Sequence, residues 1–66
     1  MTESEKNETL ERLMTLRSSI EERIAELERL EKASKDEEEI AKIYDSRMYL
    51  TIAFENIVLG IKELLD

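Results

Sequence analysis

Three polar side chains recur every four residues in an otherwise apolar stretch: Arg47, Thr51 and Glu55. This spacing places them in one row along a helix, where a buried charge needs a partner. Three interpretations are open. Arg47 of one chain pairs with Glu55 of a symmetry-related chain and fixes their register, or Arg47 runs its stem over the core and reaches water. Alternatively, both residues line a ligand cleft with Tyr44 or Tyr49.

The acidic run Asp36–Glu39 is the second candidate for chemistry, as a cation site or a docking patch. It lacks the spacing and the glycine of a calcium loop. A di-metal helical bundle uses Glu-x-x-His pairs, which a chain without histidine cannot supply. Acidic residues are favourable in the first turn of a helix. We therefore interpret the run as a helix start and expect no metal and no cofactor.

The common catalytic arrangements around a histidine or a cysteine cannot form in this chain. With no histidine and no cysteine, Ser-His-Asp and Cys-His arrangements are impossible, and one glycine cannot build a phosphate-binding loop. The carboxylates lie in polar sequence, without the apolar surroundings that raise a pKa toward that of a general acid. We therefore predict that the protein is not an enzyme.

The size and charge of the chain restrict its partners. Its 66 residues allow one domain, and without disulfides or metals so short a chain folds stably by oligomerisation or by very good helix packing. The net charge of −7 argues against a nucleic-acid partner, because that affinity rests on Lys and Arg. Since no signal peptide and no apolar run of about 20 residues is visible, we expect no membrane contact and a cytoplasmic location.

The elements that must position these residues are two helices. Thr2 and Glu5 match a capping box, and a helix is expected over about 4–32. Its apolar side is assigned to the leucine and isoleucine residues Leu10, Leu13, Leu16, Ile20, Ile24, Leu27 and Leu30. Arg23 is expected at the edge of this side. Pairs at i,i+4, namely Glu8/Arg12, Glu28/Lys32 and Glu31/Lys35, are expected on the exposed faces.

The apolar pattern lapses over 33–36, where Ser34 and Glu37 suggest a second capping box. A second helix is predicted over 37–65, with a stripe in alternating three- and four-residue steps formed by Ile40, Ile43, Arg47, Leu50, Phe54, Ile57, Ile61 and Leu64. The fold class is therefore all-α, a two-helix αα-hairpin. One continuous helix forming a coiled coil is the alternative, because the turn contains neither Gly nor Pro.

The second helix carries more apolar surface than one partner helix covers, with further apolar residues on its other sides. Ser46, Ala53 and Gly60, seven residues apart, form a row of small residues that would let another helix approach closely. The alternative is a tolerated glycine near a fraying end. We predict an antiparallel four-helix bundle formed by two chains, whose interface contains Arg47, Leu50, Ala53, Phe54, Ile57, Gly60 and Ile61.

Two resemblances accompany this pattern. Met1-Thr2 with Glu5-Lys6, the length and the central break resemble the Rop family, which implies a dimeric four-helix bundle that binds RNA. The basic and aromatic face that RNA binding implies is absent, and the first helix exposes glutamates instead. Residues 51–55 and 61–65 are similar to a helix of HEPN-type domains, which partner minimal nucleotidyltransferases. The ribonuclease motif of that family needs a histidine that this chain lacks.

The sequence thus predicts a non-enzymatic homodimeric bundle that acts as an interaction or regulatory module. One alternative is an acidic inhibitor or nucleic-acid-mimicking decoy of a basic partner, in which the carboxylates occupy a basic cleft. Another is a Rop-like RNA-binding bundle. The expected partner is a second copy of the chain, with another protein as the alternative.

Overall fold

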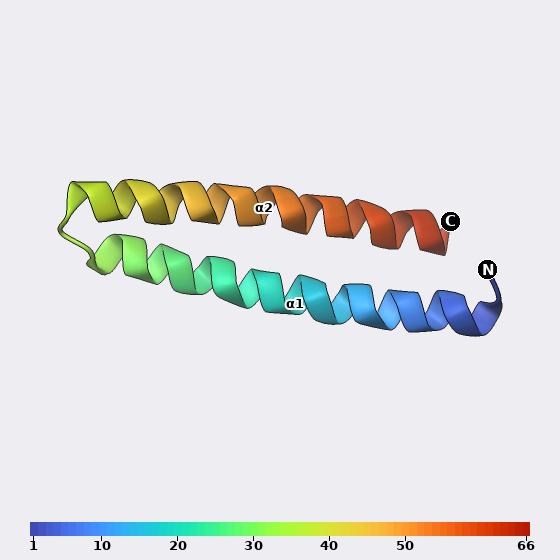
Figure 1. Cartoon of the computed structure of the whole chain (residues 1–66). Coiled ribbons are helices and arrows are strands. Elements are labelled where there is room, and N and C mark those ends of the chain that lie inside the picture. Colours follow the sequence, from blue (N-terminus) through green and yellow to red (C-terminus); the bar gives the residue numbers. More distant parts are fainter.

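The computed structural model describes all residues, Met1–Asp66, as two antiparallel α-helices joined by a short turn (Figure 1). Helix α1 spans Glu3–Ala33 and helix α2 spans Glu37–Leu65. The two chain termini lie together at the end opposite the turn, and the hairpin measures 51 × 14 × 12 Å. The predicted all-α hairpin is confirmed, and a single continuous helix is not formed.

The first helix begins at the predicted capping box. The Thr2 hydroxyl accepts a hydrogen bond from the Glu5 backbone N–H at 3.1 Å, and the Glu5 carboxylate accepts one from the Thr2 backbone N–H at 2.9 Å. These bonds satisfy two donors that a helix start leaves free. The backbone bond from Thr2, and after it the Thr2 side chain, lower the pKa of the Glu5 carboxyl, because both favour its charged form.

The second helix begins differently from the sequence prediction. Asp36 is its N-cap, and the Asp36 carboxylate accepts a hydrogen bond from the Glu38 backbone N–H at 3.0 Å. Ser34, the predicted cap, instead closes α1: its backbone N–H donates to the Leu30 carbonyl at 3.0 Å. The predicted Ser34/Glu37 capping box is therefore wrong. Both residues suit a cap chemically, and the extended backbone of Ser34 and Asp36 places the new helix start two residues later.

The side of α1 that packs on α2 also differs from the prediction. Leu16 and Leu30 were expected on this side, but they are 48% and 47% exposed. Arg17 and Glu31 are less exposed and take these places, so that the covered row follows strictly alternating three- and four-residue steps: Leu10, Leu13, Arg17, Ile20, Ile24, Leu27 and Glu31. The predicted row needed two three-residue steps in succession to include Leu16 and again to include Leu30. Two such steps rotate the position around the helix axis, so these two leucines lie outside the packed side.

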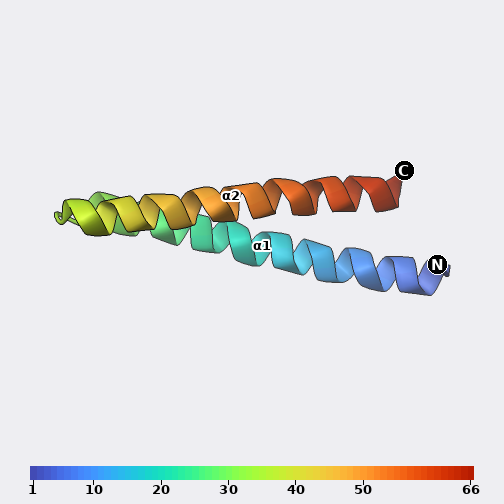
Figure 2. The same ribbon diagram turned by 45° about the horizontal axis from the view of Figure 1, so that its top comes forward.

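The packed side of α2 follows its predicted stripe, from Ile40 to Leu64, although most of its residues remain half-buried. Ile61 is the one buried residue, at 5% exposure. The two helices cross at a small angle, as is seen when the ribbon is turned (Figure 2). Two helices alone cannot surround a core, so the packed residues are open along both edges of the hairpin.

Candidate functional site

The ion pair that joins the two helices is formed by Arg47 of α2 and Glu31 of α1. The Arg47 Nε donates a hydrogen bond to the Glu31 Oε2 of α1 at 3.0 Å, and the two side chains are only 22% and 23% exposed. The predicted i,i+4 partner of Glu31, Lys35, is not used. The sequence analysis did not predict the Arg47–Glu31 pair, because its two residues lie on different helices. Recognising that Glu31 lies in the packed row of α1 would have suggested the pair.

Two further contacts hold Arg47 in place. Its guanidinium carbon lies 5.2 Å from the centroid of the Tyr44 ring, within cation–π distance. The Thr51 hydroxyl donates to the Arg47 backbone carbonyl at 2.9 Å, so Thr51 is satisfied within its own helix. Arg47 is therefore paired inside one chain, whereas the sequence offered an interchain pair, a solvated head or a ligand cleft.

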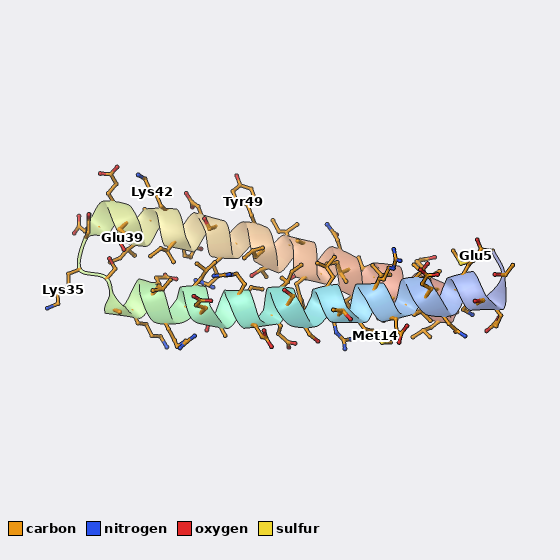
Figure 3. All side chains as sticks on the ribbon, turned by 60° about the horizontal axis from the view of Figure 1, so that its bottom comes forward. Glu5, Met14, Lys35, Glu39, Lys42 and Tyr49 are labelled. Carbon is orange, nitrogen blue, oxygen red and sulfur yellow. The ribbon has the colours of Figure 1, made fainter.

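Glu55 and Tyr49 lie away from this cluster. Glu55 is exposed and borders a shallow hollow with Phe54, Val58 and Leu59. Tyr49 is 75% exposed and projects from α2 on the side away from α1 (Figure 3). The polar row is thus not gathered into one cleft within the chain. Pairing of Arg47 with Glu55 of another chain stays a prediction, and it would compete with Glu31 for the same guanidinium.

We expect Glu31→Gln to destabilise the hairpin by about 1–2 kcal/mol. This value lies between the small contribution of exposed ion pairs and the larger cost of leaving one partner of a buried pair alone. The measurement is urea unfolding followed by circular dichroism, at one fixed protein concentration.

Glu28→Gln is the matched control for this prediction. Glu28 lies one turn earlier beside the same hollow, which Glu31, Lys32, Ile40 and Arg47 complete, but it is exposed and makes no ion pair. Its replacement should change the free energy of unfolding by less than about 0.5 kcal/mol. Equal effects of the two substitutions would mean that the Glu31–Arg47 contact contributes nothing specific.

The two edges of the hairpin differ in chemistry. One edge carries the hollow around Arg47. Most of the charged residues in or next to the packed rows of the two helices lie at this edge. We name this edge the charged face, and its charged residues are Arg17, Glu21, Glu28, Glu31 and Arg47. A second hollow marks the other edge. It is lined by Ile20 and Leu50 from the packed rows and by the polar α1 residues Ser19, Glu22, Arg23 and Glu26.

We name this second edge the apolar face. Over 9–30 and 43–64, it comprises the rows reached in steps of seven residues from the lining residues Ile20, Arg23 and Leu50, and the small-residue row that lies three residues beyond Ile43, Leu50 and Ile57, where Gly60 approaches Leu13. Its residues are Thr9, Leu13, Leu16, Ile20, Arg23, Leu27, Leu30, Ile43, Ser46, Leu50, Ala53, Ile57, Gly60 and Leu64. Arg23 is the one charged residue in these rows, and Glu22 and Glu26 border the same hollow. The Arg23 guanidinium pairs with Glu26 at 3.0 Å, and the Arg23 side chain is 60% exposed at the edge of the packed side.

The seven residues predicted for a dimer interface divide between the two edges. Leu50, Ala53, Ile57 and Gly60 belong to the apolar face, whereas Arg47, Phe54 and Ile61 lie in the row that leads to the charged face. Leu16 and Leu30 were missed, because the sequence assigned them to the covered side of α1. Their exposure adds two large apolar side chains to the apolar face beside the row of small residues.

A separate apolar strip, which we name the outer strip, lies on the side of α2 that points away from α1. Met48, Ile52 and Leu59 are 38%, 53% and 57% exposed there. These residues are separated from the apolar face by Tyr49 and Asn56. The outer strip therefore forms a distinct surface, and its residues provide controls for the apolar face.

The acidic run lies at the start of α2, where Glu37, Glu38 and Glu39 form the first turn. The Glu38 carboxylate lies 3.4 Å from the Lys42 Nζ. No three acidic side chains of the chain converge on a point where they could hold a metal ion. Neither helix contains a stretch that is both long and apolar enough to pass through a bilayer.

By fold and surface, the chain is an all-α helical hairpin with one charged and one apolar face. Searches for resemblance among protein families, curated proteins and solved structures found no match.

Proposed function

We propose that the protein is a non-enzymatic homodimeric module, in which two hairpins pack apolar face against apolar face into a four-helix bundle. The observation that carries this proposal is the continuous apolar face, on which Leu16 and Leu30 are about half exposed. Packing the two apolar faces together would cover, in each copy, one of the two edges along which the packed rows are open. Four-helix bundles bury the same rows of each helix between two layers.

The exposed area of the chain supports a second copy as the occupant of this face. A compact monomer of 7.8 kDa is expected to expose about 4,400 Å². The hairpin exposes 5,294 Å², which is about 900 Å² more. A standard protein interface buries about 800 Å² on each partner. Burying the apolar face in a symmetric dimer would therefore bring the area exposed per chain close to that of a compact protein.

Sedimentation equilibrium over a wide concentration range tests the proposal. We expect a folded species with twice the 7.8 kDa chain mass, dissociating only on dilution. A helical monomer at all concentrations would contradict it. A chain that is largely unfolded by circular dichroism and monomeric would also contradict it, and would assign the apolar face to a different protein.

Gly60 offers a sharper test, because the hairpin and the dimer should respond in opposite directions. A Cβ at position 60 would lie 4.0 Å from the Leu13 Cδ1, an ordinary contact, so Gly60→Ala fits the isolated hairpin. Removing a mid-helix glycine should stabilise the helix by up to about 1 kcal/mol. If the second copy approaches closely at Gly60, the same methyl group should weaken dimerisation.

We therefore expect Gly60→Ala to raise the dimer dissociation constant several-fold while helicity at low concentration rises. The two measurements are sedimentation equilibrium and circular dichroism of the dissociated chain. An exposed-helix control is Asn56→Ala, on the outer side of α2, which should leave the dissociation constant unchanged. Equal or tighter dimerisation of Gly60→Ala would show that the glycine is merely tolerated.

A further inference from the structure

We propose that the two hairpins stack with both turns at the same end of the bundle, so that α1 of each copy lies over α2 of the other. This inference rests on the homodimer proposed above and specifies its orientation. Two face-to-face arrangements have two-fold symmetry. An axis along the helices places the turns together and pairs α1 with α2, whereas an axis across the helices separates the turns and pairs each helix with its own copy.

Side-chain size separates the two arrangements. The outermost row of the apolar face is large on α1, where it includes Leu16, Arg23 and Leu30, and small on α2, where it consists of Ser46, Ala53 and Gly60. Helix spacing depends on the side chains at the contact, and interiors are close-packed. Pairing α1 with α1 sets large residues against large ones and pairs the small rows with each other, which requires unequal spacings on the two sides. Pairing α1 with α2 sets a large row against a small one on both sides.

The register of the hairpin makes this fit specific. Glu31 pairs with Arg47, and Leu30 and Ser46 directly precede these residues. Because the helices are antiparallel, residues at the same height along the hairpin are found by moving seven residues back on α1 and seven residues forward on α2. The approach of Gly60 to Leu13 agrees with this register. An axis along the helices preserves each level in the partner. The facing residues of the two copies are then Leu16 with Gly60, Arg23 with Ala53, and Leu30 with Ser46.

The position of Arg23 agrees with this arrangement. Its guanidinium is already directed to solvent, where it pairs with Glu26. Ala53 of the partner is short enough for the Arg23 stem to pass over it and keep the charge in water. The one charged residue of the apolar face is thus accommodated without being buried.

Spin-label distances test the orientation, because the chain contains no cysteine. Lys35 lies in the turn and Ser4 precedes Glu5 at the opposite end (Figure 3). The variants Lys35→Cys and Ser4→Cys each receive one nitroxide, and dipolar electron spin resonance then measures the distance between the two copies. We expect both distances to be of the order of 20 Å, an interhelical spacing of about 10 Å plus two label side chains.

Turns at opposite ends would instead place the Lys35 labels about as far apart as the hairpin is long, 51 Å, and this result would overturn the inference while leaving the homodimer intact. Absence of dipolar coupling at concentrations up to the millimolar range would overturn the homodimer itself. As a control, adding Ala53→Glu to each labelled chain should abolish the interchain signal.

Discussion

Replacing Ala53 with glutamate is expected to weaken dimerisation at least a hundredfold. Ala53 lies in the middle of the small row on the apolar face, and the proposed bundle covers it with the second copy. The added carboxylate would be desolvated there, and its side chain would fill the space that the stem of Arg23 from the second copy crosses in the proposed stack. The Arg23 guanidinium is already paired with Glu26 of its own chain. A cost of about 3 kcal/mol or more is therefore expected, which corresponds to a factor above one hundred in the dissociation constant. The symmetric interface contains the substitution twice, which increases the effect.

Ile52→Glu is the matched control, because Ile52 is the preceding residue but points to the outer side of α2, where it is 53% exposed. This variant has the same charge change and the same helix. We expect its dissociation constant to stay within about threefold of that of the wild type, since exposed substitutions have small effects. Sedimentation equilibrium measures both variants. If Ile52→Glu dissociates the dimer and Ala53→Glu does not, the interface lies on the outer strip instead.

Replacing Ile61 with alanine is expected to cost about 2–5 kcal/mol of unfolding free energy. Ile61 is the one buried residue, so its truncation removes buried methyl groups from between the two helices. A folded chain of this length is stable by about 3–10 kcal/mol. The variant should therefore lose a large share of its stability and unfold at a clearly lower urea concentration. Urea unfolding, followed by circular dichroism at one protein concentration, measures the difference.

Leu59→Ala provides the comparison for Ile61. Leu59 lies two residues earlier and is 57% exposed on the outer strip, so the same kind of truncation should cost less than about 0.5–1 kcal/mol. The ratio of the two effects is informative even if absolute stabilities depend on concentration. An Ile61 effect no larger than that of Leu59 would mean that the two helices do not pack as described.

Much of the fold could be read from local patterns. The Thr2/Glu5 box starts α1 because the side chain of each residue accepts a hydrogen bond from the backbone N–H of the other within a single turn. The stripe from Ile40 to Leu64 packs on α1 as its strict spacing predicts. The second cap was harder, because Ser34 and Asp36 are both suitable and only the path of the turn distinguishes them.

The candidate interface was only partly predictable. Ala53 and Gly60 were recognised from their seven-residue spacing, which is a property of one helix. Leu16 and Leu30 were misplaced, because two phases of the α1 pattern were both apolar enough to be the covered side. Tertiary packing selected the phase that contains Arg17 and Glu31, which brings Glu31 to Arg47.

By itself, the sequence determined the all-helical character of the chain, the strict stripe of α2 and the absence of histidine and cysteine. These properties follow from residue types and from spacing within one helix. Only the tertiary structure decided which side of α1 is covered, which carboxylate holds Arg47, and which edge of the hairpin is apolar. Those properties depend on the register between two helices, because an interhelical register places residues far apart in the chain at the same level.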